Sequence, residues 1–326
     1  MIENLGSHPT ILIVFSVVIL GMLILDLGVF NKKAHHVTNK EAAIWTLVWI
    51  SLSMLFSVFV LTQTSVEKFS QFQSAYWIEK ALSVDNLFVF ILVFNFFKVP
   101  DESHHKVLFW GIIGALFMRA LFIFTGVGLI NYTYLPDMTL FNKVVSINFI
   151  LTAFGLFLIY AGIKSWFSDE DDEEQDFSKS RGARLVHKLF NVSEHFDKDK
   201  FFTIQNGVKL ATPLLVVVGV IEFTDLLFAV DSIPAIFSIA PDDPFILYTS
   251  NIFAILGLRS MYFLLSNFIH MFSKLKYGLA IILSFIGLKM VISPFYHIDT
   301  LLSLLIVLSV LIGSVVLSIL SPKPVE

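Results

Sequence analysis

Two stretches of this sequence place acidic residues inside segments that are otherwise apolar enough to cross a membrane. The first spans residues 79–86 and the second spans 222–234. An ionised side chain at the centre of a membrane helix costs roughly 2.5 to 3.5 kcal/mol on the insertion scale, so it needs a partner, a proton or a bound ion. We therefore expect a binding site, whose candidate members are Glu79, Asp85, Asn86, Glu222, Asp225, Asp231 and Ser232.

The oxygen atoms of these side chains are ligands that hard cations prefer. Carboxylate, amide and hydroxyl groups suit Mg²⁺, Ca²⁺ and Mn²⁺, whereas the chain has no cysteine and its histidines lie in loops or near the ends of the expected spans. On a regular helix Glu222 and Asp225 share a face, but Asp231 lies about 120° from Asp225, so a shared ion needs a broken helix or a partner helix. Without an ion, repulsion between the carboxylates favours proton uptake. The site thus indicates a divalent cation and suggests cation–proton exchange.

Five bases and one further acid accompany these residues within the expected spans. Arg119 and Arg259 keep their charge, and we interpret them as counter-ions of the carboxylates. Lys164 and Lys289 lie near span ends, where long side chains extend to the membrane surface, while Asp26 fits an interfacial residue and a site member equally well. The predicted charge network comprises Asp26, Lys80, Arg119, Arg259, Lys164 and Lys289. A purely structural network of these bases with the acids is the alternative to an ion site.

The composition indicates the class of protein that positions these residues. Of 326 residues, 56% are hydrophobic and 15% are charged, and the mean hydropathy is +0.80, which is outside the usual range of soluble domains. A net charge of -4 provides no basic surface for nucleic acid. We expect an all-α polytopic membrane protein that forms a single membrane domain over residues 1–326. A span needs about 20 apolar residues, and the candidates are 9–30, 41–62, 74–97, 106–130, 142–167, 208–239, 243–267, 273–293 and 299–320.

The distribution of lysine and arginine predicts the orientation of these nine spans. The loops after the first, third, fifth and seventh spans hold most of these residues, whereas the opposite side has only Lys68 and Lys143. The positive-inside rule then places the N-terminus outside and the C-terminus in the cytoplasm. Residues 168–207 become a cytoplasmic linker, in which an acidic run is followed by basic residues and by an amphipathic stretch, 183–190, that fits an interfacial helix.

The sixth candidate span is too long for one straight crossing. Asp231 and Ser232 resemble helix N-caps, and Pro234 lacks the N–H that a helix interior requires. We therefore predict a discontinuous helix at this point, whose freed carbonyl groups could coordinate an ion.

The two acidic stretches also belong to an internal repeat. Three pairs of motifs recur in the same order: Glu79-x5-Asp85-Asn86 with Asp225-x5-Asp231-Ser232, Met118-Arg119-Ala120 with Leu258-Arg259-Ser260, and Gly162-Ile163-Lys164 with Gly287-Leu288-Lys289. Each copy holds three spans, so the second copy must enter the membrane from the opposite side. We predict a 3+3 inverted repeat of residues 74–167 and 208–293, followed by a final helix at 299–320. Such repeats are typical of secondary transporters that bind substrate at the midplane.

Residues 79–90 and 222–237, together with 249–259 and 275–280, resemble the TerC/Alx family of integral membrane proteins, and the resemblance extends from about residue 40 to 297. It implies a bacterial inner-membrane protein of the broader LysE-like transporter group that exports Mn²⁺. The family's acidic motif residues correspond here to Glu79, Asp85, Asn86, Glu222, Asp225, Asp231 and Ser232. The family name refers to tellurium resistance, whose link to transport is indirect.

The sequence thus favours a divalent cation transporter, with export of Mn²⁺ preferred, no permanently bound cofactor, and the lipid bilayer and a divalent metal ion as partners. Two alternatives stay open: a transporter of another cation, Ca²⁺ or H⁺, and a non-transporting membrane scaffold in the response to metal or tellurium stress. We expect no enzymatic activity, because the sequence has neither a His-Glu-x-x-His metal motif nor a Gly-x-Ser-x-Gly nucleophile turn.

Overall fold

A computed structural model describes residues 9–30, 38–136, 138–140, 143–167, 176–268, 275–296 and 298–320. Within these ranges, the side chains of 25–30, 85, 138–140, 143–145, 230–231, 267–268 and 275 lie outside the description. Two of the predicted cation ligands, Asp85 and Asp231, and the network candidate Asp26 are therefore placed only by their backbone, within helices.

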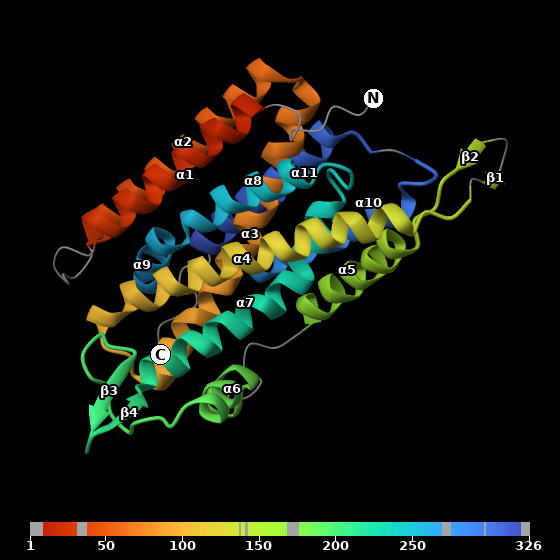
Figure 1. Ribbon diagram of the computed structural model, residues 1–326. Helices are drawn as coiled ribbons and strands as arrows, with labels where there is room; N and C mark the ends of the chain where they lie inside the picture. Colours follow the sequence, from red (N-terminus) through yellow and green to blue (C-terminus); the bar gives the residue numbers. More distant parts are fainter. Residues whose placement is uncertain are drawn as a thin grey trace.

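The described chain is almost entirely helical, and its long helices run side by side (Figure 1). The helices are α1 (Pro9–Phe30), α2 (Asn39–Gln63), α3 (Val66–Phe97), α4 (Asp101–Tyr132), α5 (Phe149–Phe167), α6 (Arg181–Leu189), α7 (Pro213–Phe237), α8 (Pro244–Leu256), α9 (Leu258–Phe268), α10 (Leu275–Ile292) and α11 (Thr300–Leu320), with a 3-10 turn η2 (Phe177–Lys179). Two antiparallel hairpins, β1 (Met138–Leu140) with β2 (Lys143–Val145) and β3 (Phe202–Gln205) with β4 (Val208–Ala211), lie at opposite ends of the bundle (Figure 1).

Length and composition allow six of the described helices to cross a membrane, namely α2, α3, α4, α5, α7 and α11. The described part of α1 is a shorter apolar helix. Large apolar side chains remain exposed on the outer helices; Ile24 of α1 is 68% exposed and Leu317 of α11 is 61% exposed. Exposure on this scale fits contact with lipid rather than water. The all-α polytopic membrane fold is thus confirmed, whereas the count of nine spans remains a prediction.

Helix α3 occupies the centre of the bundle, where it contacts α2, α7, α8, α9, α10 and α11. It begins after Ser65, whose hydroxyl accepts the backbone N–H of Lys68 at 3.3 Å, and it ends at Lys98 in the left-handed conformation. The N-cap satisfies an otherwise unpaired N–H group of the first turn. The 32 residues between these ends place Glu79 near the middle of the helix, surrounded by other helices.

The prediction of a broken sixth span is wrong. Helix α7 is continuous through Asp231, Ser232 and Pro234, so Asp231 and Ser232 are not N-caps. Pro234 lies in the last turn, where it removes one hydrogen-bond donor shortly before the helix ends at Phe237. The break occurs instead in the seventh predicted span, at Gly257 between α8 and α9.

Two predicted spans also begin later than the sequence indicated. Residues 143–145 form β2 and residues 208–211 form β4, so helices α5 and α7 begin only at Phe149 and Pro213. In the second hairpin the chain turns at Asn206 and Gly207, which both have positive φ. Asn-Gly is the dipeptide that tight hairpin turns favour. The apolar residues of β4 lie directly before the helix, so hydropathy alone includes them in the expected span.

Helices α5 and α10 approach each other closely through glycines in a reciprocal manner. A Cβ added to Gly162 would lie 2.7 Å from the carbonyl oxygen of Ala280 and 2.9 Å from the backbone nitrogen of Ser284. A Cβ added to Gly287 would lie 2.5 Å from the carbonyl oxygen of Gly155 and 2.8 Å from the backbone nitrogen of Ile159. On α10, Ala280 and Ser284 lie seven and three positions before Gly287. On α5, Gly155 and Ile159 lie seven and three positions before Gly162, so the two contacts have the same pattern.

This close approach predicts opposite effects for two glycine-to-alanine substitutions. Gly162→Ala is expected to lower the free energy of unfolding by about 1–3 kcal/mol, because backbone atoms of α10 must move. The matched control Gly128→Ala places its methyl group in open space on α4, so the higher helix propensity of alanine should leave stability equal or raise it by up to about 1 kcal/mol. Thermal unfolding in detergent compares the two; equal melting temperatures would contradict the steric account.

Candidate cation-binding site

Three predicted residues, Glu79, Arg119 and Asp225, meet in the core, and the arginine on α4 contacts both acids. Arg119 is fully buried, and its Nη1 donates to Oε1 of Glu79 on α3, while its Nη2 donates to Oδ1 of Asp225 on α7 at 3.4 Å. Glu79 is also fully buried and Asp225 is 5% exposed. One guanidinium therefore faces two carboxylates, which leaves these three side chains with one more negative than positive charge when all are ionised.

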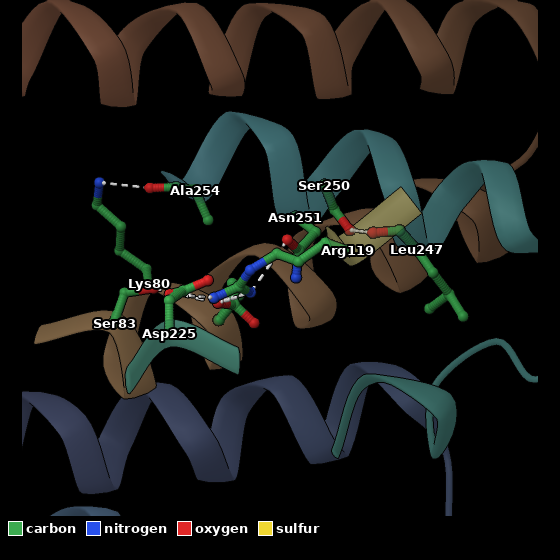
Figure 2. A network of polar contacts seen from close by, with 9 residues as sticks. Lys80, Ser83, Arg119, Asp225, Leu247, Ser250, Asn251 and Ala254 are labelled. Atoms are coloured by element: carbon green, nitrogen blue, oxygen red, sulfur yellow. Dashed lines mark hydrogen bonds and ion pairs between the residues drawn. The ribbon is translucent and has the colours of Figure 1, made fainter. Parts of the chain in front are cut away.

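Helix α8 supplies a member of this cluster that the sequence interpretation missed. Asn251 is fully buried, and its Oδ1 accepts a second hydrogen bond from Nη1 of Arg119 at 3.1 Å (Figure 2). The available signal was the run Thr249-Ser250-Asn251 inside an apolar helix, because polar side chains are costly there without partners. In the structure the hydroxyl groups of Thr249 and Ser250 donate to carbonyl groups of the preceding turn. Of the three residues, Asn251 makes the interhelical contact.

Several buried polar atoms of the cluster, and of Asn86 and Ser232 farther along α3 and α7, have no hydrogen-bond partner in the described part of the chain. They are Oε2 of Glu79, Nε of Arg119, Nδ2 of Asn251, Nδ2 of Asn86 and Oγ of Ser232, and all are buried. The other oxygen of Glu79 is well supplied, since it accepts from Arg119 and from Ser83 at 3.2 Å. Buried polar atoms in proteins are nearly always paired, so Oε2 of Glu79 differs from most buried acceptors in having no partner among the described residues.

Glu222 lies one turn before Asp225 on α7 and is half-buried. Its carboxylate lies directly against Gly114 of α4, since a Cβ at that glycine would be 2.0 Å from Oε2. The glycine therefore provides the space that the carboxylate occupies between α4 and α7. Among the described side chains, no three acids or histidines form a group close enough to hold a metal ion, and Asp85 and Asp231 are not among them.

The remaining predicted residues occupy separate positions. Lys80 points to the break between α8 and α9, and Arg259 is buried just after that break. Lys164 is exposed, whereas Lys289 is only 6% exposed and interacts electrostatically with Asp299. The structure thus brings together Glu79, Arg119 and Asp225, and it separates the two terminal lysines from them.

A second buried ion pair, also missed from the sequence, joins the starts of α3 and α8. Nζ of Lys68 lies 2.7 Å from Oδ2 of Asp243, and their side chains are 9% and 2% exposed. Oδ1 of the same aspartate accepts the backbone N–H of Ile246 at 3.2 Å and so caps α8. Asp243 therefore starts one helix and holds it to the central one.

Comparison with known proteins assigns this arrangement to a family. Residues 64–324 match the model of the integral membrane protein TerC family. The chain belongs to the TerC family. It is therefore an integral, multi-pass membrane protein in contact with the lipid bilayer, and the resemblance inferred from its acidic motifs is confirmed.

Similar TerC-family proteins match nearly the whole chain. The putative membrane-bound redox modulator Alx of Escherichia coli (strain K12) is 41% identical over 93% of this chain and 92% of its own length. The membrane protein STKORF319 of Myxococcus xanthus is 41% identical over 95% and 92%, and a membrane protein of Rickettsia bellii (strain RML369-C) is 36% identical over 96% and 98%. No solved structure matches.

Proposed function

We propose that this TerC-family protein is a divalent cation transporter, with Mn²⁺ export favoured, and that it carries out no enzymatic reaction. The observation that carries the proposal is the buried Glu79 carboxylate, whose Oε2 has no partner among the described residues although Arg119 holds the other oxygen. Asp225 faces the same guanidinium from α7. Carboxylate oxygens on two different helices at membrane depth suit a hard divalent cation as substrate.

Movement of the ion would follow from an inverted repeat. The repeat predicted for 74–167 and 208–293 makes α3, α4 and α5 the counterparts of α7, α8 with α9, and α10. The reciprocal contacts of Gly162 and Gly287 between α5 and α10 support this relation. The pairing of acids from α3 and α7 with Arg119 also supports a site between the two copies, as alternating access requires.

The resemblance of its motifs favours a location for the protein, and the distribution of lysine and arginine favours an orientation. The protein would lie in a bacterial inner membrane with its N-terminus outside and its C-terminus in the cytoplasm. In that orientation α6 and the β3–β4 hairpin, which lie together at one end of the bundle (Figure 1), face the cytoplasm. Helix α6 packs on α7 so closely that a Cβ at Gly182 would lie 2.2 Å from the carbonyl oxygen of Gly219.

The names of the relatives provide a second candidate, a role in redox modulation without transport. Several relatives are named as redox modulators. If this chain had such a role without transport, its buried charges would only fix the packing of α3, α4, α7 and α8. This chain has no cysteine, so its own thiol–disulfide chemistry is excluded. A scaffold of this kind would not move ions across a sealed membrane.

Transport can be tested with purified protein in sealed vesicles of known orientation. Wild-type protein is expected to carry Mn²⁺ across the membrane faster than protein-free vesicles do, and an excess of a transported cation should slow this flux by competition. Faster flux of Ca²⁺ than of Mn²⁺ would retain the cation site and change the substrate. Flux of Mn²⁺, Ca²⁺ and Mg²⁺ at the protein-free rate would favour the scaffold.

A further inference from the structure

Two apolar grooves lie on the outer surface of α5, α10 and α11. The first groove runs between α5 and α10 and has a volume of about 430 Å³. The second groove runs between α10 and α11 and has a volume of about 570 Å³. Trp166 and Ile281 line both of them, so the two grooves meet at these side chains. This surface therefore offers two adjacent apolar channels to the membrane.

Glycine leaves part of the second groove without a side chain. Gly313 of α11 lines this groove, and a Cβ at that position would meet no atom of the described chain beyond its own helical turn within 4 Å. An unfilled gap forfeits dispersion contacts on the side where no atom lies. In a bilayer the apolar material that surrounds the helices is lipid tails. An acyl chain is therefore the occupant that the apolar lining fits.

Aromatic and basic side chains gather at one end of both grooves. The ring centres of Trp166 on α5 and Tyr277 on α10 are 5.1 Å apart, and Nζ of Lys276 lies 5.2 Å from the centre of the Tyr277 ring. Lys164 is exposed on α5, one turn before Phe167, which lines the first groove. Trp and Tyr are enriched at the level of lipid headgroups. This end of the grooves thus fits the membrane surface and carries two lysines.

We propose that this surface binds an anionic phospholipid, whose acyl chains occupy the two grooves and whose phosphate is bound by Lys164 and Lys276. Within their described ranges, α5, α10 and α11 contain no aspartate or glutamate, so the charge that these helices present at this end is positive. Basic residues between membrane helices at the cytoplasmic surface are suited to anionic headgroups, and the orientation proposed above places this end there. The inference concerns lipid binding and does not depend on cation transport.

The charge of the headgroup distinguishes this site from general contact with lipid. Each lysine near the membrane surface favours an anionic lipid by about fivefold, so two lysines favour it by about 25-fold over a zwitterionic lipid. Residues 169–174 are all acidic and follow α5 in the sequence, outside the described residues. Acids near the headgroup would oppose the lysines, so a direct comparison of the two headgroup types is the decisive test.

Quenching of Trp166 by lipids with brominated tails measures occupation of the grooves, because bromine quenches tryptophan fluorescence only at close range. The full chain is placed in phosphatidylcholine vesicles that contain an equal, small fraction of brominated phosphatidylglycerol or brominated phosphatidylcholine. The chain has five tryptophans, so the signal of Trp166 is the difference between wild-type protein and Trp166→Phe. Brominated phosphatidylglycerol is expected to reach half-maximal quenching at a fraction about fivefold lower, or lower still.

The double variant Lys164→Gln with Lys276→Gln tests the headgroup contact. It is expected to lose the preference for phosphatidylglycerol, because both cations at this end of the grooves are removed. Arg184→Gln with Lys188→Gln removes two exposed cations of α6 and is the matched control, which should keep the preference. If the lysine double variant does not fold, high salt in the wild-type experiment takes its place, since salt screens exposed charges and should weaken the preference.

Gly313→Leu tests the chain contact. Its side chain fills the second groove without meeting another helix within 4 Å of the new Cβ, so it is expected to lower the quenching of Trp166 by either lipid by about half or more. Gly21→Leu is the matched control, because Gly21 is exposed on α1 and its Cβ would also meet open space. This control should quench as wild type does.

Three results would overturn the inference. The first is equal quenching of Trp166 by both brominated lipids in wild-type protein. The second is a preference for phosphatidylglycerol that survives both the lysine double variant and high salt, or Trp166 quenching that is unchanged in folded Gly313→Leu. The third is quenching by neither lipid together with a dimer that Gly313→Leu dissociates, which would make these grooves an interface between two copies of the chain.

Discussion

Replacing Arg119 with methionine is expected to lower the free energy of unfolding by about 3–5 kcal/mol, because two buried carboxylates lose their shared cation. Glu79 is fully buried and Asp225 is 5% exposed, so water has little access to either acid in the folded protein. Chemical or thermal unfolding in detergent measures the loss. Arg184→Met, at an exposed position on α6, is the matched control and should change stability little.

A second substitution tests whether the loss arises from charge rather than from packing. Adding Glu79→Gln to Arg119→Met removes one uncompensated charge and is expected to restore part of the stability. If Arg119→Met cannot be purified in a folded form, the same comparison can begin from Arg119→Gln, which also removes the charge but keeps a hydrogen-bond donor. A double variant no more stable than the single one would contradict the electrostatic account.

Lys68→Met is expected to cost about 3 kcal/mol, since it leaves the 2%-exposed Asp243 side chain without its ammonium partner. Asp243 also caps α8 by accepting the backbone N–H of Ile246. The double variant Lys68→Met with Asp243→Asn keeps an acceptor for that N–H and removes the uncompensated charge. It is expected to recover most of the stability, as measured by unfolding in detergent, and a single-variant loss below about 1 kcal/mol would place this pair in the range of exposed ion pairs.

The sequence located the membrane helices because long apolar runs admit few other structures in a bilayer, where every backbone polar group must be paired within the chain. It failed where local structure depends on short turns. The apolar residues of β4 continue the hydrophobic pattern of α7, and only the Asn206-Gly207 turn marks them as a hairpin. A hydropathy pattern alone therefore extended α7 too far toward its N-terminus.

The sequence predicted which types of residue form the site more successfully than it predicted how those residues are arranged. Glu79 and Asp225 were candidates because ionised groups in apolar spans are costly without a partner or a bound ion. In the structure both acids contact Arg119. Which polar group of another helix would complete the cluster depended on packing, so Asn251 was missed. The break at Gly257 was missed for the same reason, since its dihedral angles (φ -78, ψ -3) are helical and the contacts of Lys80 and Trp49 are tertiary.

Mn²⁺ flux into oriented, sealed vesicles tests most directly whether the carboxylates on α3 and α7 bind the transported divalent cation. Wild-type protein, Glu79→Gln and Asp225→Asn should be compared with Asp199→Asn, which changes an exposed acid before β3. We predict that the Asp199 variant transports as wild type does, while each site variant is folded and loses about tenfold or more of the flux, because a charged ligand is replaced by a neutral one. Undiminished flux in folded Glu79→Gln and Asp225→Asn would contradict the account.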